Sequence, residues 1–567
     1  MADTYVYTPL PNASYIRVLL LHPNPSFEEP IQCDLVIQHR DAPGEYAALS
    51  YSWGMDSDGN ASACRTIETT GALHNITQNL FEGLRRIRST TTETRLWVDS
   101  VCINQADVEE KNQQVAHMAD VYSKANKTIV WLGEGQSESD DLATLGFFCF
   151  LTHYMPFLPD DFQREERDAF GSFLPSFKWP GSEGAEQHLW SRQDGQVVDL
   201  AAIFTWVHKK MPDEERAAIY RSNGRIQADL METCRLLHAF FDRRYFSRRW
   251  ICQELYHPPW PAMEARWGPC VFPLLLLHRR LVHSILREGI VAIKNSQNSN
   301  SSATVDLRNL HLLEDTLRCA LRFNSILAVK GKSGSQRMLT TAMSYLHGQQ
   351  CADPRDRLFA LISMDPKFGL QPDYGLDTVQ AYTLFARMLV EKGLLSIIFC
   401  NLEATTTDRQ TAWKAKAASG PINPLDDLPS WVPDLRLAFE DTFATYPKID
   451  AVVDEYNILV CPVREIGVLR QSTDGTDEGH RQIIVARNGD TGSGVLRKKD
   501  KGPPLVAGDV VYEVCEPPMT RGCKAPHVLI LRPHAQMKNR FTLVYVRLGR
   551  DKSWPKSTEQ VDFVRIV

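Results

Sequence analysis

The sequence predicts an α/β protein: a doubly wound parallel sheet with a helical insertion in its N-terminal half, followed by a helical and then a β-rich C-terminal region. Two observations predict the sheet. Short apolar segments of strand length alternate with segments that carry apolar residues at helical spacing. Some of the short segments are apolar on both faces, which is typical of strands buried in a parallel sheet. Further strand-like segments after residue 428 predict the β-rich region.

The expected elements of the first half alternate between strands and helices. Strands are expected at residues 17–21, 33–37, 46–51, 96–103 and 128–132, and helices at residues 75–88 and 107–125. The first helix carries apolar residues at positions 76, 80, 84 and 87, which fall on one face. The second begins after Asp107, with Glu110 as the other half of a predicted capping box. In a doubly wound sheet, ligands bind at the carboxyl ends of the strands.

Three regions are expected along the chain. The first, residues 1–293, contains an insertion at about 135–240, which we interpret as a cap or a partner surface. A polar, low-complexity segment at 294–306 separates it from a mainly helical region at 307–427, with helices at 310–323 and 379–392. The β-rich domain at 428–567 has expected strands at 452–462, 482–487, 508–515, 527–532 and 541–548, and a loose segment at 471–504.

Composition limits the possible functions. The chain has 567 residues, of which 43% are hydrophobic and 23% charged, and its formal net charge of −6 gives no footprint for nucleic acid or an anionic membrane. The most apolar run, residues 272–278, is too short to cross a bilayer, and no signal peptide is recognised, so we expect a cytoplasmic protein. Thirteen scattered cysteines without a Cys-x-x-Cys pair indicate reduced thiols, and no residue spacing indicates a metal site.

The most informative stretch is Ser247-Arg-Arg-Trp250-Ile-Cys-Gln-Glu254. Ser247 is a favourable N-cap, and Pro258 would end a helix that began there. Trp250 and Glu254 are four residues apart, so they share one face of that helix. Two interpretations stay open: Glu254 forms a structural ion pair with a neighbouring arginine, or its carboxylate is held ready for chemistry.

This stretch and two upstream blocks resemble the fungal heterokaryon incompatibility (HET) domain. The upstream blocks are Tyr46-Ala-Ala-Leu-Ser-Tyr-Ser-Trp-Gly54 and Leu96-Trp-Val-Asp-Ser-Val-Cys-Ile-Asn-Gln105, the latter running on to Val130-Trp-Leu-Gly133. Three segments in the second half, at residues 353–356, 372–374 and 428–434, resemble the same proteins more weakly. We expect a salt-bridged turn at the first of them. The resemblance covers about the first half of the chain and implies fungal non-self recognition and regulated cell death.

The order of the blocks also resembles, more distantly, the Toll/interleukin receptor (TIR) domain, which has a flavodoxin-like sheet. Plant members carry Ser-x-Trp-Cys-Leu-x-Glu-Leu on a helix after the third strand, and residues 247–255 are close to that pattern, with one extra residue between Ser and Trp. The glutamate at that place is catalytic in TIR domains that hydrolyse NAD. The resemblance therefore implies a catalytic role for Glu254, although the long insertion before it departs from that family.

Cleavage of NAD needs a carboxylate beside the ribose, where positive charge develops in the transition state. Asp99, at a predicted strand end, is the second catalytic candidate. The candidate substrate-binding residues are Tyr51, Ser52, Trp53, Gly54, Cys102, Asn104 and Trp250. Tyr51 or Trp53 would stack on a ring of the dinucleotide, and backbone amides near Gly54 would face its phosphates.

These residues also have structural interpretations. Trp53 and Gly54 fit a packed aromatic residue and a turn glycine, and Asp99 fits an ion pair or a loop cap. Cys102 would be a nucleophile only if a histidine such as His117 lay beside it. A buried structural thiol is the commoner role of such a cysteine.

Three hypotheses of function follow. In the first, a HET-domain protein of non-self recognition and cell death hydrolyses NAD at its TIR-like site, with NAD as substrate and with neither cofactor nor metal. In the second, the same half is a non-enzymatic signalling adaptor that assembles with itself or with another incompatibility protein. In the third, the domain has been recruited to an unrelated biosynthetic reaction, with the insertion as a lid. Nucleic acid and membranes are not expected partners.

Overall fold

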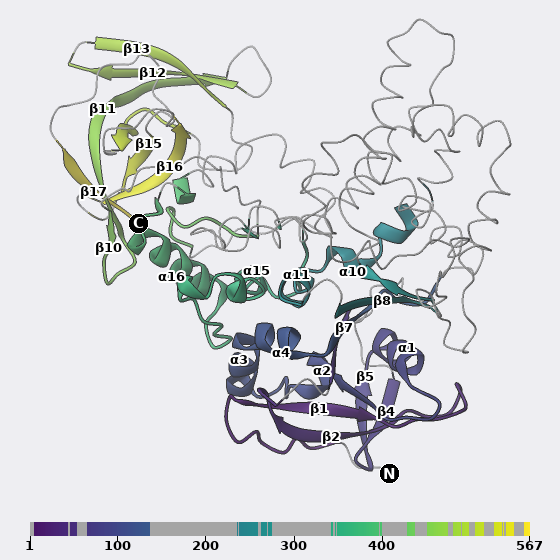
Figure 1. Ribbon diagram of the computed structural model, residues 1–567. Helices are drawn as coiled ribbons and strands as arrows, with labels where there is room; N and C mark the ends of the chain where they lie inside the picture. The colour runs from purple at the N-terminus through teal and green to yellow at the C-terminus, as the bar shows by residue number, and fades with distance from the viewer. Residues whose placement is uncertain are drawn as a thin grey trace, which may run out of the picture. The chain divides into compact units, whose positions relative to one another are not determined.

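The computed structural model of the chain contains two compact units, Met1–Gly334 and Ser335–Val567 (Figure 1). The residues that it describes are 5–42, 46–53, 65–135, 235, 238–258, 262–268, 270–274, 342–343, 346, 349–395, 397–399, 428–436, 451–474, 480–488, 490–497, 505–514, 527–535, 537, 540–548 and 561–567. The predicted insertion at 135–240, apart from residues at its two ends, lies outside this set. So do the predicted linker at 294–306 and the predicted helix at 310–323. The division of the second half into 307–427 and 428–567 stays a prediction.

The N-terminal unit is built on a nine-stranded sheet in the order β5-β4-β2-β1-β6-β3-β7-β8-β9. Its strands are β1 (Tyr15–Leu21), β2 (Gln32–His39), β3 (Ala47–Tyr51), β4 (Arg65–Thr69), β5 (Ala72–Ile76), β6 (Thr94–Trp97), β7 (Lys127–Trp131), β8 (Met263–Trp267) and β9 (Cys270–Pro273). Four neighbouring strands, β6, β3, β7 and β8, are parallel. All five residues of β3 are buried, as its apolar sequence predicts for a central strand.

The sheet is mixed, so the prediction of a parallel sheet holds only for these four strands. β1 pairs antiparallel with β2, because the short connection of residues 22–31 contains no crossover helix and returns the chain in the opposite direction. β1 also pairs antiparallel with β6. A hairpin of β4 and β5, which the sequence did not reveal, pairs with β2. β9 closes the other side and runs antiparallel to β8.

Helices cover both faces of the parallel strands. On one face α1 (Gln78–Ile87) approaches β7 so closely that a Cβ on Gly83 would meet the indole of Trp131 at 3.0 Å. Trp131 pairs in register with Tyr51, and successive strand residues point to opposite faces, so Ser50 faces the other side. There Ser50 contacts α11 (Ile251–Tyr256), which packs against α4 (Met118–Lys124). The winding of helices around both faces is therefore as predicted.

Two predicted boundaries near the sheet were wrong. Residue 76 belongs to β5. The Thr77 side chain accepts from the backbone N–H of Leu80 at 3.4 Å and caps α1, so the helix begins at Gln78, three residues later than expected. The predicted strand at 96–103 ends at Trp97. Four of its remaining residues form α2 (Asp99–Cys102), since a short, largely apolar run fits a buried helical turn as well as a strand.

Two predicted helices are also interrupted. The helix at 107–125 divides at His117 into α3 (Val108–Ala116) and α4. Asp107 caps α3 as predicted, through the backbone N–H of Glu110 at 3.0 Å. Ser247 is the last residue of α10 (Arg244–Ser247), and its hydroxyl donates to the carbonyl of Arg244. It is therefore not the N-cap that we predicted, and α11 begins only after Trp250.

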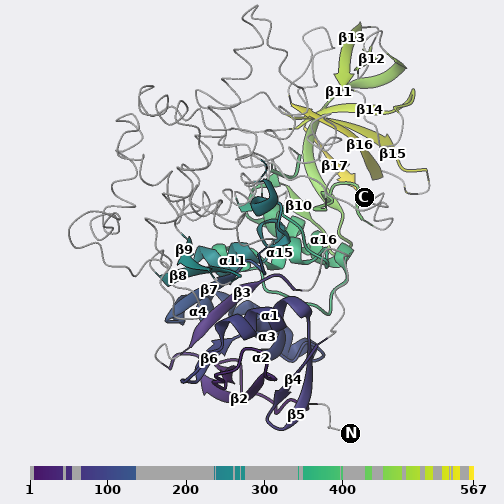
Figure 2. The same cartoon turned by 90° about the vertical axis from the view of Figure 1, so that its right-hand side faces the viewer.

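The C-terminal unit carries an eight-stranded sheet, in the order β13-β12-β11-β14-β15-β16-β17, with β10 paired to β11. Its strands are β10 (Val452–Val453), β11 (Leu459–Asp474), β12 (His480–Arg487), β13 (Asp490–Arg497), β14 (Val510–Val514), β15 (His527–Pro533), β16 (Arg540–Leu548) and β17 (Asp562–Ile566). The prediction of a β-rich C-terminal region is confirmed. The segment at 471–504, expected to be loose, instead contains the end of β11 and the β12–β13 hairpin (Figure 2).

Helices precede this sheet within the same unit. They are α15 (Asp356–Phe359), the 3-10 turns η5 (Ile362–Met364) and η6 (Pro366–Phe368), and α16 (Thr378–Glu391). Asp377 and Gln380 form a reciprocal capping box at the start of α16, which confirms the helix predicted at 379–392. α16 packs against β10 (Figure 2).

Within the described part of the chain, no helix combines the length and the apolar character that crossing a bilayer requires. Five cysteines in the same residues, at positions 33, 102, 252, 351 and 461, are free thiols.

Candidate functional site

The candidate site lies at the carboxyl ends of β3 and β6. Because these strands are parallel neighbours, Trp53 after β3 and Asp99 after β6 reach the same edge of the sheet. The indole Nε1 of Trp53 donates to both carboxylate oxygens of Asp99, at 2.9 Å and 2.8 Å. Trp53 is 40% exposed, whereas Asp99 is only 7% exposed. The structure thus brings together two residues that the sequence singled out separately.

Asp99 is a buried carboxylate whose protonation is easily changed. Burial raises its pKa to about 6, and the negative charge of Glu254 adds to the rise. Arg248 and the hydrogen bonds from Trp53 and the Ser100 backbone lower the pKa, but by less. Asp99 is therefore mostly ionised at neutral pH and takes up a proton in mildly acidic solution.

Glu254 lies on α11 and is 1% exposed. Arg248, in the link between α10 and α11, donates from Nη2 to Oε1 at 3.1 Å and from Nη1 to Oε2 at 3.4 Å. Ser50 of β3 donates to Oε2 in a short hydrogen bond, and its hydroxyl lies 2.7 Å from that of Tyr245. Both carboxylate oxygens are therefore bound within the domain. Of the two interpretations of Glu254, this arrangement supports the structural ion pair with a neighbouring arginine.

Arg248 acts electrostatically on two buried carboxylates. Burial disfavours its charged form, but the charges of Glu254 and Asp99 outweigh burial and hold the pKa of Arg248 above its usual value. An ion pair at such depth is costly to break from one side, because the remaining charge is left without compensation.

The other residues predicted at the end of β3 have different surroundings. Tyr51 is 1% exposed and donates to the hydroxyl of Ser100 at 2.6 Å, so its ring supports α2 and offers no surface for stacking. The carbonyl of Ser52 accepts from Asn79 Nδ2 at 2.8 Å. The buried Ser52 hydroxyl has no hydrogen-bond partner among the described residues. Gly54 lies outside the described residues.

Cys102 and Asn104 hold the local structure together. Cys102 is 1% exposed, and its sulfur accepts from the backbone N–H of Val98 at 3.3 Å; burial raises the pKa of this thiol to about 12. The Asn104 side chain accepts from the backbone N–H of Ala106 at 3.2 Å and so closes the turn before α3. Trp250 is half-buried at the N-cap of α11.

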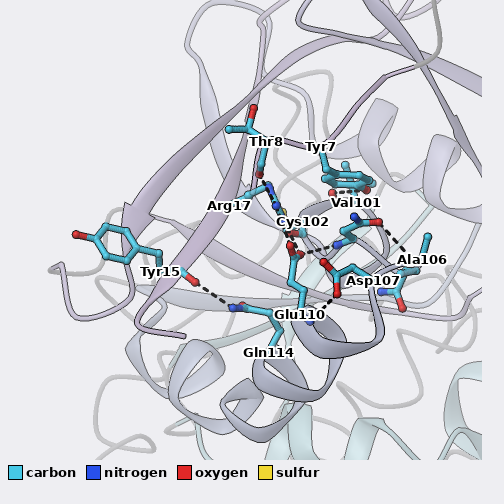
Figure 3. A network of polar contacts seen from close by, with 12 residues as sticks. Tyr7, Thr8, Tyr15, Arg17, Val101, Cys102, Ala106, Asp107, Glu110 and Gln114 are labelled. Atoms are coloured by element: carbon cyan, nitrogen blue, oxygen red, sulfur yellow. Dashed lines mark hydrogen bonds and ion pairs between the residues drawn. The ribbon is translucent and has the colours of Figure 1, made fainter. Parts of the chain in front are cut away.

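A polar network centred on Arg17 and Glu110 holds the loop between α2 and α3 (Figure 3). Arg17 Nη1 donates to the carbonyl of Cys102 at 3.1 Å, and Nη2 donates to the carbonyl of Thr8 at 2.6 Å. Glu110 Oε1 accepts from the backbone N–H of Asn104 at 2.7 Å. This use of the Glu110 carboxylate replaces the predicted return contact of a capping box. The network fixes the segment that carries Asp99.

Ser50, Tyr245 and Arg17 were not among the predicted site residues. Alternation along β3 would have placed Ser50 on the face opposite Tyr51, where a polar residue needs a partner. Arg17 interrupts an otherwise apolar strand, and a charge buried there requires a carboxylate. No comparable signal points to Tyr245. Over the described positions, no group of three or more metal-binding side chains occurs.

Comparison with known proteins identifies the family. The model of the heterokaryon incompatibility protein (HET) family matches residues 46–254, a range that runs from β3 to Glu254. Heterokaryon incompatibility protein 6, OR allele, of Neurospora crassa is 33% identical over 535 residues, which cover 88% of this chain and 68% of that protein. No solved structure matches the chain. The resemblance seen in three sequence blocks is confirmed, and the chain belongs to the heterokaryon incompatibility (HET) family.

Proposed function

We propose that this HET-family chain acts in fungal non-self recognition and in the regulated cell death that follows, and that its N-terminal unit is a signalling adaptor in the conformation seen here. Family membership supports the recognition role, since the Neurospora relative is a heterokaryon incompatibility protein. We expect the adaptor to assemble with itself or with another incompatibility protein in the cytoplasm.

The burial of the Glu254 carboxylate supports the non-enzymatic adaptor function. A carboxylate that promotes NAD cleavage must face the ribose, where positive charge develops. Here Glu254 is 1% exposed, and its oxygens are bound by Arg248 and Ser50. The positive charge beside it belongs to the protein itself. In this state Glu254 stabilises the domain and is not available to a substrate.

NAD hydrolysis is the second candidate, and the strand order favours it. The four parallel strands follow one another along the chain as β3, β6, β7 and β8, but lie in the sheet in the order β6-β3-β7-β8. This 2-1-3-4 order supports a TIR- or flavodoxin-like sheet. In that order the switch point falls between β3 and β7, and Trp53, which is 40% exposed, follows the carboxyl end of β3. A dinucleotide would bind there, and hydrolysis would then require Arg248 to leave Glu254.

One experiment separates the two candidates. Purified protein is incubated with NAD and free nicotinamide is measured, for the wild type, Glu254→Gln and the exposed control Glu109→Gln. The same variants are expressed in a fungal strain that meets an incompatible partner. The adaptor predicts no nicotinamide above the buffer level in any sample, and cell death with all three proteins.

The hydrolase predicts the reverse pattern. Wild type and Glu109→Gln would release nicotinamide, Glu254→Gln would lose at least about 100-fold in rate, and its cell death would disappear with the activity. Retained cell death in Glu254→Gln decides more clearly than the nicotinamide assay, because an enzyme that needs assembly would release no nicotinamide as an isolated monomer. Retained cell death in this variant would contradict the hydrolase.

A further inference from the structure

We propose that the outer face of β10, β11 and β17 in the C-terminal unit is a self-association surface, which binds the same surface of a second copy of this chain. We call it the β10–β17 patch, and its members are Val452, Glu455, Tyr456, Phe563 and Arg565. This surface rests on the adaptor function proposed above, because an adaptor that assembles with itself needs such a contact.

The register of three neighbouring strands places the patch on one face (Figure 1). β11 pairs with β10 on one side and with β17 on the other, so Val452, Val460 and Arg565 lie in one row. Register partners point to the same face of a sheet. Phe563 is two residues from Arg565 on β17 and therefore points to that face as well. On the opposite face Ile566 is 0% exposed and belongs to the core.

The patch exposes three large apolar side chains. Val452 is 62% exposed, Phe563 is 64% exposed and Tyr456 is 70% exposed. In the described part of the chain, neither ring contacts another aromatic ring or a cation. Exposed apolar side chains that lie together are typical of a protein–protein contact, and aromatic residues are enriched in such contacts. Their burial against a second copy therefore favours association.

The turn between β10 and β11, which carries Glu455 and Tyr456, is held by side chains. Asp454 Oδ1 accepts from the backbone N–H of Tyr456 at 2.9 Å. Arg387 of α16 donates from Nη1 to the carbonyl of Asp454 at 3.2 Å and to Asn457 Oδ1 at 2.9 Å. A surface that is ordered before it binds loses little conformational entropy on association.

The charges of the patch favour a second copy as its partner. Arg565 and Glu455 are both exposed, and over the residues that the structure describes neither side chain forms a hydrogen bond or an ion pair. A two-fold axis through the patch makes each contact occur twice, with the roles of the copies exchanged. Arg565 of each copy then faces Glu455 of the other. A partner that is only acidic or only basic would compensate one of these charges and repel the other.

The test exchanges the two charges. Arg565→Glu and Glu455→Arg each place like charges in both contacts, so we expect each to raise the Kd of the dimer at least about 10-fold. In a mixture of the two single variants, one copy carries two glutamates and the other two arginines, so both contacts again join opposite charges. The mixture should therefore dimerise within about 3-fold of the wild-type Kd. Sedimentation velocity of the full chain measures all four samples.

Matched variants outside the patch provide the controls. Arg470→Glu changes an exposed arginine farther along β11, and its Kd should equal that of the wild type. Phe563→Ala should weaken the dimer about 10-fold, whereas Val506→Ala, at a side chain that is 43% exposed, should not. Thermal unfolding should be unchanged in every variant, because the substituted side chains are exposed.

Three results would overturn this surface. The first is a wild-type chain that stays monomeric at about 100 µM, even if it binds another incompatibility protein through the patch. The second is a dimer that neither single charge variant weakens. The third is a mixture of the two variants that dimerises no better than either alone, because the two residues then do not meet across the copies.

The same variants connect the dimer to the signal. Cell death with an incompatible partner should be lost in Arg565→Glu and return when Glu455→Arg is expressed beside it. A failed dimer test with cell death retained in Glu254→Gln leaves the adaptor standing and makes this surface wrong. Loss of cell death together with nicotinamide release in Glu254→Gln makes the adaptor wrong, whatever the dimer shows.

Discussion

The guanidinium of Arg17 donates to both carboxylate oxygens of Glu110, at 2.6 Å and 2.9 Å, across 93 residues of sequence. Their side chains are 1% and 10% exposed, so this is a buried ion pair. The pair joins β1 to α3, and its further bonds hold the loop after α2. The position of Asp99 at the sheet edge depends on this contact between two distant segments.

Arg17→Met should therefore destabilise the N-terminal unit by about 3–5 kcal/mol, because it leaves Glu110 buried without a counter-charge. The surface pair of Lys124 and Asp41 provides the control, and Lys124→Met should change stability little, because water screens an exposed pair. Hydrogen exchange of peptides from β1 and β6 measures both effects. A loss in Arg17→Met no greater than in Lys124→Met would show that the pair does not organise the unit.

The buried carboxylate of Asp99 should make stability depend on pH. Its pKa is about 6 in the folded protein, above the ordinary 3.8, so between about pH 4 and 6 the folded state binds more protons than the unfolded state. This contribution to stability is fully present below about pH 4 and is lost as the pH rises through about 6.

Asp99→Asn should remove this slope, because the amide keeps an oxygen for the Trp53 N–H but carries no charge. At pH 7.5 the variant should be more stable, by on the order of 1 kcal/mol, and at pH 4 it should match the wild type. Hydrogen exchange of peptides from β3 and β6 at the two pH values checks this. Asp41→Asn is the control with the opposite sign, since Lys124 lowers the pKa of Asp41. An unchanged slope in Asp99→Asn would assign the pH dependence to other groups.

The fold was predictable wherever local signals agreed. The completely buried β3 reads as a central strand, and Asp107 and Asp377 cap the helices that follow them. The β4–β5 hairpin was missed because its residues are largely exposed and carry no apolar pattern. The direction of β1 was missed as well, since pairing direction depends on how the chain connects and not on the strand's own residues.

The site was predictable only in part, for a similar reason. Arg248 is six residues from Glu254, so the sequence named it as a candidate partner. Ser50 is 204 residues away, and only the sheet brings its hydroxyl to that carboxylate. The contact between Trp53 and Asp99 likewise requires β3 and β6 to be neighbours. The resemblance to the HET and TIR families singled out these residues, but it predicted neither their hydrogen-bond partners nor how deeply they are buried.

Cys102 should be chemically inert in the folded protein. It is 1% exposed, and burial raises the pKa of its thiol to about 12, so almost no thiolate is present at pH 8. We expect iodoacetamide to modify it at least about 100-fold more slowly than the half-exposed Cys351, and at a similar rate after unfolding in urea. Mass spectrometry of peptides measures both rates. Equal rates in the folded protein would restore Cys102 as a candidate nucleophile.

Arg355 joins two motifs of the C-terminal unit. It forms an ion pair with Asp353 at 2.7 Å, which confirms the predicted salt-bridged turn, and donates from Nη1 to the carbonyls of Tyr374 and Leu376 at 2.8 Å and 2.6 Å. The Tyr374 hydroxyl donates to Asp356 Oδ1 at 2.7 Å. The Asp-Pro-Arg-Asp turn and the Pro-Asp-Tyr segment thus form one structural contact.

Arg355→Lys should cost about 2 kcal/mol, because an ammonium group cannot reproduce the guanidinium's several fixed directions, and Tyr374→Phe should cost about 1 kcal/mol. Thermal unfolding and hydrogen exchange of residues 349–395 report the loss, and exchange at β1 should not change. Cell death should persist in both variants. If Arg355 instead contacted a ligand or partner, Arg355→Lys would abolish cell death without loss of stability, and the turn would be a functional site.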